Sequence, residues 1–273
     1  MKKAPFSPPS NWAKLYARLE DYRRTLEAPV DTVGCHMLRD RTASPETQRF
    51  HTLVALMLSA QTKDNVTAVA MQTLIQRGLT PQSVQAMTES DLDSCICKVG
   101  FHNTKAKNIK KVADIIVSDY HGHVPREYSD LIAFPGVGPK MAHLFLQDAD
   151  NRIIGIGVDT HVHRISQRFG FVPNTVKTPE DTRKALESWL PRKHWGTINH
   201  LMVGLGQTIC TPLRPKCDIC KLNDICTNAF KETKITGGSQ SPRPASPKKQ
   251  PRLEGEAPSD DASGKPTPKR ARR

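Results

Sequence analysis

The chain has 273 residues, of which 37% are hydrophobic and 25% charged, and its formal net charge at pH 7 is +13. This length and apolar content can form one large globular domain or two modest ones. No run of eighteen apolar residues occurs, so no membrane-spanning helix is expected, and the positive charge indicates a polyanionic partner.

The N-terminal residues and the cysteines bear on the redox compartment. Met1–Pro5 contain two lysines, but no apolar segment follows them, so no secretory signal is expected. Without export, thiols stay reduced. We therefore predict that Cys35, Cys95 and Cys97 are free thiols.

Helical periodicity dominates the chain up to about residue 232. Apolar residues at steps of three and four predict helices at residues 12–26, 50–58, 65–76, 92–99, 105–120, 140–146, 160–169 and 179–189. Glycines at positions 78, 100, 122 and 170 are suited to end helices. No alternating strand pattern competes, so the predicted fold class is all-α.

Residues 233–273 have a different composition. They hold seven prolines and no aromatic residue, which predicts a disordered tail. Ten Lys/Arg against four Asp/Glu in this segment leave +7 on residues 1–232, so the folded part is itself basic. Basic clusters at 247–252 and 268–273 resemble nuclear-import signals, which predicts a nuclear location. Alternatively, the tail only adds nonspecific affinity for phosphates.

Residues 131–140 read as two helices joined by a tight turn. Residues 131–134 end a short helix, residues 135–138 form the turn, and Pro139 suits the first position of the next helix. Gly136 and Gly138 allow backbone conformations closed to other residues. With Val137 they would then offer N–H groups to a phosphate at a helix N-terminus. Such a helix-hairpin-helix grips the DNA backbone without reading sequence, although a plain corner between helices is the alternative.

Lys140 follows this turn, in the first turn of a helix, where the macrodipole disfavours a cation. Positive potential and partial burial both favour a neutral amine, which is the form that a Schiff-base nucleophile needs. Lys140 is therefore a candidate nucleophile. The alternative is an exposed lysine that faces phosphate.

Asp159 stands just before a predicted helix, where a carboxylate most often caps the first free N–H groups. The same carboxylate could stabilise positive charge that develops on a sugar. His161 and His163 are two residues apart on that helix and should point to different faces. We interpret them as packing or phosphate contacts and not as metal ligands.

Four cysteines, Cys210, Cys217, Cys220 and Cys226, have the spacing C-x6-C-x2-C-x5-C. Four thiols within seventeen residues indicate a shared soft metal centre. An iron–sulfur cluster is the first interpretation, and a structural tetrahedral zinc site is the second.

Four motifs follow one another along the chain and together resemble those of a known family. They are LSAQT at 58–62, FPGVGPK at 134–140, VDTH at 158–161, and the cysteine spacing. Over about residues 45–230 the chain resembles the endonuclease III family, in a eukaryotic form. The resemblance implies a helix-hairpin-helix DNA glycosylase fold. It also implies a bifunctional DNA glycosylase and abasic-site lyase that removes oxidised pyrimidines from duplex DNA and cleaves the strand by β-elimination.

The resemblance also assigns roles to residues. Lys140 would attack the sugar with help from Asp159, and the four cysteines would hold a [4Fe–4S] cluster that is not the catalyst. Gln61, and with it Phe101, would be wedges that fill the space left by a flipped base. Without the resemblance, Gln61 reads as a polar helix end and Phe101 as a core aromatic.

Arg214 and Lys216, in the loop between the first two clustered cysteines, would contact phosphates. The implied partners are duplex DNA with damaged pyrimidines or abasic sites, and downstream base excision repair proteins. The absence of an apparent coiled coil favours a monomer. The short basic N-terminus leaves a mitochondrial fraction open.

The family architecture implies four parts: an N-terminal segment (1–41) packed on the cluster module, a six-helix module with the hairpin (42–152), a helical cluster module (153–232), and the basic tail (233–273). Lys140 and Asp159 would then face each other across a cleft. Two rival interpretations remain: an adenine glycosylase, in which the nucleophilic lysine is absent, and a non-catalytic iron–sulfur DNA-binding protein.

Overall fold

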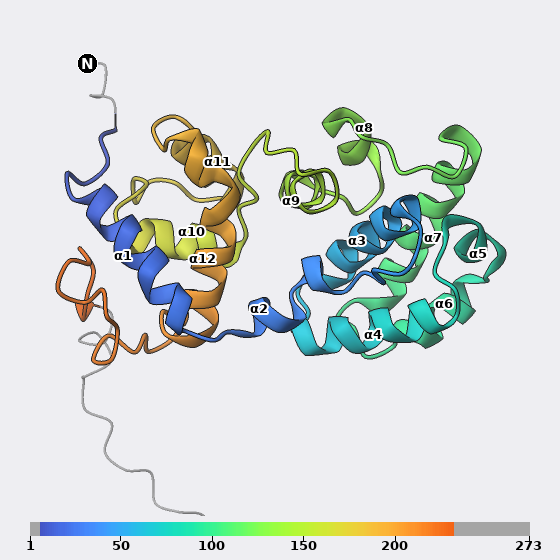
Figure 1. Ribbon diagram of the computed structural model, residues 1–273, viewed down its shortest axis with the longest axis horizontal. Helices are drawn as coiled ribbons and strands as arrows, with labels where there is room; N and C mark the ends of the chain where they lie inside the picture. The colour runs from blue at the N-terminus through green and yellow to red at the C-terminus, as the bar shows by residue number, and fades with distance from the viewer. Residues whose placement is uncertain (1–5, 232–273) are drawn as a thin grey trace, which may run out of the picture. The chain divides into compact units, whose positions relative to one another are not determined.

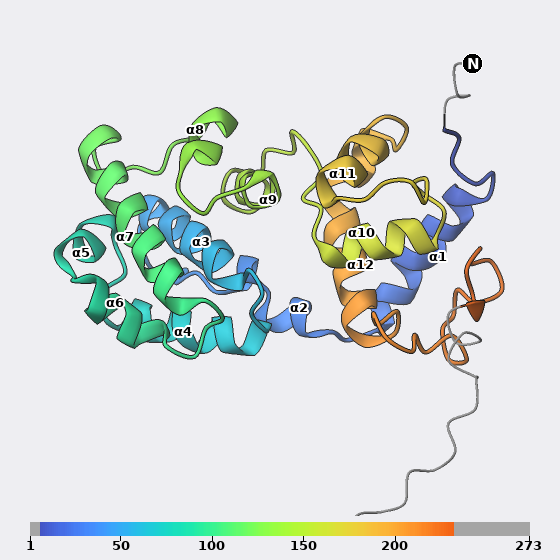
Figure 2. The same ribbon diagram turned by 180° about the vertical axis from the view of Figure 1, so that it is seen from behind.

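The computed structural model describes residues 6–231, and the regular elements in that range are helices, with no β-strand (Figures 1 and 2). The all-α prediction is confirmed. In chain order the elements are α1 (Trp12–Thr25), α2 (Pro29–Val33), η1 (Cys35–Met37), α3 (Pro45–Ser59), α4 (Asp64–Gln76), α5 (Pro81–Ala86), α6 (Glu89–Ile96), α7 (His102–Asp119), α8 (Tyr128–Ala133), α9 (Pro139–Asp150), α10 (Thr160–Arg168), α11 (Pro179–Glu187), η2 (Arg192–His194) and α12 (Trp195–Thr208).

A first hydrophobic core is formed by helices that follow one another in the chain, from α3 to α9. Helix α3 is buried around most of its circumference and packs on α4, α7 and α9. Phe50 and Leu53 of α3 and Phe145 of α9 are fully buried. This core begins at Phe50 and ends at Leu146, so the chain closes it without help from distant segments.

A second hydrophobic core joins segments from both ends of the described chain. Helix α1 packs on α12, and α12 packs on α10, as Figure 1 also shows. Leu15 and Tyr16 of α1 contribute to the same cluster as Phe171 and Met202, all of them buried. The short helix α2 contacts both α12 and α4, and thereby links the two cores.

The structure differs from the sequence prediction mainly in three helices that were not anticipated. Helices α2 and α5 have five and six residues, too few to show a helical period. Helix α12 is apolar over most of its surface because it is buried on several sides, so no amphipathic pattern marks it. Among the predicted helices, α3 begins at Pro45 and α9 continues to Asp150, both beyond the expected limits.

Two further sequence predictions concern membrane-spanning helices and the C-terminal tail. None of the described helices combines the length and apolar composition that crossing a bilayer requires. The predicted tail at 233–273 and its two basic clusters lie outside the described residues. The module boundaries implied by the resemblance stay a prediction.

Candidate active site

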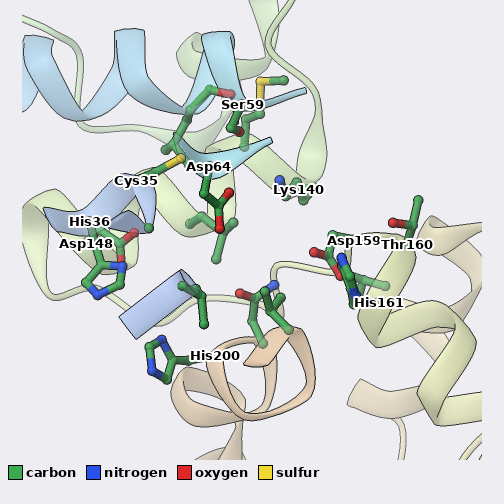
Figure 3. Close-up of a pocket in the computed structure, with 18 of the residues that line it drawn as sticks. Cys35, His36, Ser59, Asp64, Lys140, Asp148, Asp159, Thr160, His161 and His200 are labelled. Carbon is green, nitrogen blue, oxygen red and sulfur yellow. Dashed lines mark hydrogen bonds between the residues drawn. The ribbon is translucent and has the colours of Figure 1, made fainter. Parts of the chain in front are cut away.

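A cleft of about 830 Å³ lies between the two cores. The first core contributes α3, α4 and α9 to its walls, and α2, η1, α10, α11 and α12 contribute further lining residues. Lys140 and Asp159 are both among the lining residues. Figure 3 shows Lys140 on one side and Asp159, Thr160 and His161 on the other. The structure thus brings together the two residues that the sequence singles out for chemistry.

The helix-hairpin-helix places Lys140. Helix α8 ends at Ala133, the N–H of Val137 donates to the carbonyl of Phe134 (3.1 Å), and α9 begins with Pro139. Lys140 is therefore the second residue of α9, and it is half-buried. Phe134 and Val137 are buried and anchor the turn in the first core.

The two glycines of the hairpin differ. Gly136 has φ 83°, in the left-handed region that favours glycine, as expected. Gly138 has φ −107° and ψ 177°, which is extended backbone open to any residue, so it does not use the conformational freedom that a glycine allows. No atom lies within 4 Å of the place where a Cβ of residue 138 would stand, so that side of the turn is open for a close approach.

Asp159 is the N-cap of α10. Its Oδ1 accepts a hydrogen bond from the N–H of Val162 (2.8 Å), which confirms the predicted cap. The segment before it, 155–158, is buried, and Asn199 of α12 donates to the carbonyl of Gly157 (2.6 Å). The carboxylate is thus held at the cleft by the second core.

The two histidines after Asp159 have different partners, as their spacing predicts. His161 lines the cleft, and its Nδ1 accepts a hydrogen bond from Arg164 (3.2 Å). His163 Nδ1 instead pairs with the hydroxyl of Thr182 (2.6 Å). Burial lowers the pKa of both imidazoles, so both are neutral near pH 7.

Sequence reasoning missed several polar residues of the cleft. Gln207 of α12 donates to Asp64 of α4 (2.7 Å) and accepts from the N–H of Val30 in α2 (3.0 Å), so one amide ties both cores together. Asp64 follows the LSAQT motif closely, and this position was the only available signal. Gln207 stands in a segment that showed no helical pattern.

The far end of the cleft carries further titratable groups: Cys35, His36, Asp148 and His200 (Figure 3). Burial raises the pKa of Asp148 to about 6, although Arg39 and Lys140 act to lower it. Burial also raises the pKa of Cys35, which keeps this thiol neutral. Nothing in the local sequence marked these residues, because α9, η1 and α12 meet only in the folded chain.

The two proposed wedge residues share an unusual backbone. Gln61 and Phe101 both lie in the left-handed region, with φ 51° and 58°, which is uncommon for residues other than glycine. Gln61 lines the cleft and is exposed. Phe101 is 66% exposed, so its alternative interpretation as a core aromatic is wrong.

The four clustered cysteines line one pocket beside the second core. In residues 6–231, no group of three or more His, Cys, Asp or Glu side chains is gathered closely enough to ligate a single metal ion. None of the seven cysteines forms a disulfide, which agrees with the prediction for Cys35, Cys95 and Cys97. Burial raises the pKa of Cys220 to about 11, so a bound metal would have to displace protons. Four soft donors around one pocket fit an iron–sulfur cluster.

Two arginines connect this pocket to the cleft. Arg164 donates to the carbonyl of Cys210 (2.9 Å), and Arg168 donates to the Sγ of Cys210 (3.3 Å). Both belong to α10, which Asp159 caps. The loop beyond Cys210 exposes Arg214 and Lys216 to solvent and does not line the cleft.

Comparisons with known proteins agree with this geometry. Residues 54–192 match the model of the HhH-GPD superfamily of base excision DNA repair proteins, and residues 210–226 match the iron–sulfur binding domain of endonuclease III. Mouse endonuclease III-like protein 1 is 46% identical over 227 residues, which cover 83% of this chain and 76% of that protein. Chloroplastic endonuclease III homolog 2 of Arabidopsis thaliana is 48% identical, but this chain covers only 61% of its length.

Solved structures show the same relationship. A trapped covalent intermediate of endonuclease III with DNA has a TM-score of 0.69 and 28% identity, covering 81% of this chain and 98% of the other. A thermostable thymine-DNA glycosylase, at 19% identity and a TM-score of 0.64, shares the fold. The iron–sulfur domain match decides between the two metal interpretations in favour of an iron–sulfur cluster. The chain belongs to the endonuclease III family, and it is a base excision repair DNA glycosylase with an iron–sulfur cluster.

Proposed function

We propose that this enzyme is a bifunctional DNA glycosylase and abasic-site lyase that acts on oxidised pyrimidines in duplex DNA. One observation carries the proposal: Lys140 and Asp159, contributed by different cores, line the same cleft. An amine and a carboxylate at one cavity are what imine chemistry on a sugar needs. A binding-only protein would have no use for this pair.

In the first step, the lone pair of Lys140 Nζ attacks the anomeric carbon C1′ of the damaged nucleotide. The N-glycosidic bond breaks, and the base leaves with that electron pair and takes up a proton. The carboxylate of Asp159, at the start of α10, stabilises positive charge that develops on the sugar. The attached amine then loses one proton, the C1′–O4′ bond of the sugar ring breaks, and O4′ takes up a proton to become a hydroxyl, which leaves a protonated imine between Lys140 and C1′.

In the second step, the protonated imine makes the C2′ hydrogen acidic. A base in the cleft, for which we propose Asp159, accepts the C2′ proton, and the C3′–O bond breaks. The strand is thereby cleaved on the 3′ side of the sugar, with the phosphate as leaving group. Water then hydrolyses the imine and returns Lys140 as a free amine.

DNA would be held at two places outside the cleft. The hairpin turn at 136–138 would lie against one phosphate at the N-terminus of α9, with the N–H groups of Gly136 and Gly138 as the proposed donors, because the N–H of Val137 is already bonded to the carbonyl of Phe134. Arg214 and Lys216 would contact phosphates further along. Both sites read the backbone and not the sequence, so they suit an enzyme that searches DNA for damage.

The flipped base leaves a gap in the duplex that must be filled. Gln61 lines the cleft, and Phe101 is exposed and follows Gly100, which contacts the backbone of Gln61, so we assign both side chains to this gap. A cleft of about 830 Å³ has ample room for one nucleotide. Double-stranded DNA with damaged pyrimidines or abasic sites is therefore the proposed substrate.

We assign the iron–sulfur cluster, of the [4Fe–4S] type, to Cys210, Cys217, Cys220 and Cys226. When bound, the cluster supplies structural cross-links and takes no part in bond breaking. Arg164 and Arg168 contact Cys210, and through these contacts the bound cluster would help to hold α10 and Asp159 in place. The cluster would also shape the loop that carries Arg214 and Lys216.

The remaining assignments rest on the sequence. A monomer is proposed because each chain contains both Lys140 and Asp159. Nuclear location is proposed from the basic clusters at 247–252 and 268–273, with a mitochondrial fraction open, and downstream base excision repair proteins as partners. Deleting residues 233–273 from a fluorescent fusion should redistribute the protein from nucleus to cytoplasm, and an unchanged distribution would contradict the signal.

Borohydride trapping tests the proposed reaction. Wild type, Lys140→Gln and the exposed-lysine control Lys111→Gln are incubated with duplex DNA containing thymine glycol, reduced, and separated on a denaturing gel. Wild type and Lys111→Gln should give a covalent adduct, and Lys140→Gln none. Iron-loaded wild type that neither forms an adduct nor cleaves the strand would overturn the proposal. Activity only on adenine opposite oxidised guanine would support the adenine glycosylase alternative.

A further inference from the structure

Helix α7 contains a buried lysine that the proposed reaction does not use. Lys105 is 8% exposed, and its ammonium donates to the carbonyls of Leu58 (2.7 Å) and Ala60 (2.5 Å) and to the hydroxyl of Thr62 (3.0 Å). These acceptors lie at the end of α3 and on both sides of Gln61. One cation therefore fixes the backbone that presents the first proposed wedge residue.

The same cluster of contacts reaches the second wedge residue. The hydroxyl of Thr62 also accepts a hydrogen bond from the N–H of Gly100 (3.2 Å), the residue before Phe101. Gly100 lies so close that a Cβ there would stand 2.7 Å from the carbonyl oxygen of Gln61. The segments that carry Gln61 and Phe101 are thus in direct contact, and Thr62 is shared between Lys105 and Gly100.

The start of α7 also touches the hairpin. Phe101 is the N-cap of this helix, and Lys105 is one turn further on. Asn108 follows Lys105 by three residues, on the same face, and a Cβ at Gly136 would stand 2.7 Å from its Nδ2. The first two turns of α7 are therefore in contact with every proposed DNA-binding segment of the first core.

Burying an ammonium group to cap the end of a helix costs desolvation free energy. Burial lowers the pKa of Lys105 to about 8, which reflects the cost of removing the charge from water. Three acceptors offset this cost by holding the charged form. The end of α3 could be capped by water or by a left-handed glycine at no such cost. The charge is instead placed where two strained residues, Gln61 and Phe101, must keep their left-handed backbones.

We propose that Lys105 is a positioning residue that holds Gln61 and Phe101 in register, so that the two enter the DNA duplex together when a damaged base is flipped. Lys105 does not touch DNA in this account. It acts through Thr62 and the backbone on either side of Gln61. The inference rests on the wedge roles assigned under the proposed function.

The test compares one lesion in two settings. Single-turnover excision of thymine glycol is measured in a fully paired duplex and in the same duplex with the lesion inside an unpaired bubble. Wedges matter only in the first setting, because bases in the bubble are already unstacked. The proteins are wild type, Lys105→Met, Lys105→Arg and the control Lys111→Met, an exposed lysine on the same helix. Thermal unfolding confirms that each variant is folded.

Lys105→Met should lower the excision rate on the paired lesion by about tenfold, with a change of about twofold or less in the bubble. Lys105→Arg retains donors and should recover part of the loss, and Lys111→Met should behave as wild type. If Lys105→Met fails to fold, Thr62→Val replaces it, since this variant removes only the shared hydroxyl. It should show the same dependence on pairing with a smaller loss.

Two results would overturn the inference. An equal loss on paired and unpaired lesions would show that Lys105 only stabilises the end of α3. No loss in either setting would show that the contacts do not matter for base flipping. Failure of the inference is distinguishable from failure of the proposed function, because in the latter case iron-loaded wild type would excise neither lesion, and the wedge roles would fall with it.

Discussion

The two cores of this enzyme are built in different ways. The first closes within residues 50–146, from helices that are neighbours in the chain and bury their apolar faces against one another. The second gathers α1 and residues 156–222 from opposite ends of the described chain, and beyond α12 it continues into a segment with no further α-helix among the elements assigned. The first core buries 29 apolar residues between Phe50 and Leu146, whereas beyond α12 the described part of the second core adds only Ile209 and Leu222 as buried apolar residues. We therefore expect the end of the second core to depend more on polar contacts and on the cluster.

The active site combines residues from both cores. Lys140 stands on the first core, and Asp159 stands on the second, at the start of the helix whose arginines contact Cys210. The nucleophile should therefore tolerate loss of the cluster better than the carboxylate.

The largest effect is expected from the cluster. Cys220→Ser should release iron and loosen the segment from Cys210 onward, because a structural metal centre contributes folding free energy directly. Excision should fall by about a hundredfold. Hydrogen exchange should rise in α10 and α12 but not in α3 or α7, and iron content is measured alongside. Equal loosening of both cores would contradict the independence of the first.

The next prediction compares two phenylalanines: Phe145, which is buried in the first core, and Phe101, which is exposed at the N-cap of α7. Phe145→Ala removes a fully buried ring and should cost about 4 kcal/mol in the free energy of unfolding. Phe101→Ala removes a ring that is 66% exposed and should cost about 0.5 kcal/mol or less. Excision from paired duplex should nevertheless fall in Phe101→Ala. Urea unfolding and single-turnover kinetics measure the two effects, and a large stability loss in Phe101→Ala would argue against a wedge.

A substitution at Asp159 can distinguish its capping role from its proposed catalytic role. Asn caps a helix about as well as Asp, so Asp159→Asn should change the free energy of unfolding by only a few tenths of a kcal/mol. The charge is lost, and excision should slow by about a hundredfold. Unfolding and single-turnover assays on the same preparation measure both quantities. Unchanged kinetics would leave Asp159 with a capping role alone.

The smallest expected effect concerns Asp148, at the far end of the cleft. Its pKa is raised from 3.8 to about 6 by burial, so the stability that the neutral form gives is fully present below pH 3.8 and is lost as the pH rises to about 6. This shift corresponds to about 3 kcal/mol at most, and partial exposure of Asp148 reduces it, so Asp148→Asn should be more stable than wild type above pH 7 by about 2 kcal/mol. The advantage should shrink between pH 6 and 4. Urea unfolding of both proteins across this pH range measures the difference in the free energy of unfolding. A difference that does not depend on pH would contradict the raised pKa of Asp148.

Sequence reasoning succeeded where signals are local. The hairpin, Lys140 at the start of α9 and the Asp159 cap depend on residues within one or two turns of each other, and each was found at the expected place. The bridge from Gln207 to Asp64 and the far end of the cleft could not be predicted, because they join residues that only the fold brings together. Gly138 shows a different limit: a glycine marks permission for unusual backbone, and this one does not use it.

The central claim is that Lys140 is the residue that becomes covalently bound to the sugar. The most direct measurement is proteolysis and mass spectrometry of the borohydride-trapped complex of wild-type protein with DNA containing thymine glycol. The account predicts that the reduced sugar adduct lies on Lys140, within the peptide that starts α9. An adduct on Lys105, on another lysine or on the N-terminal amine would contradict it.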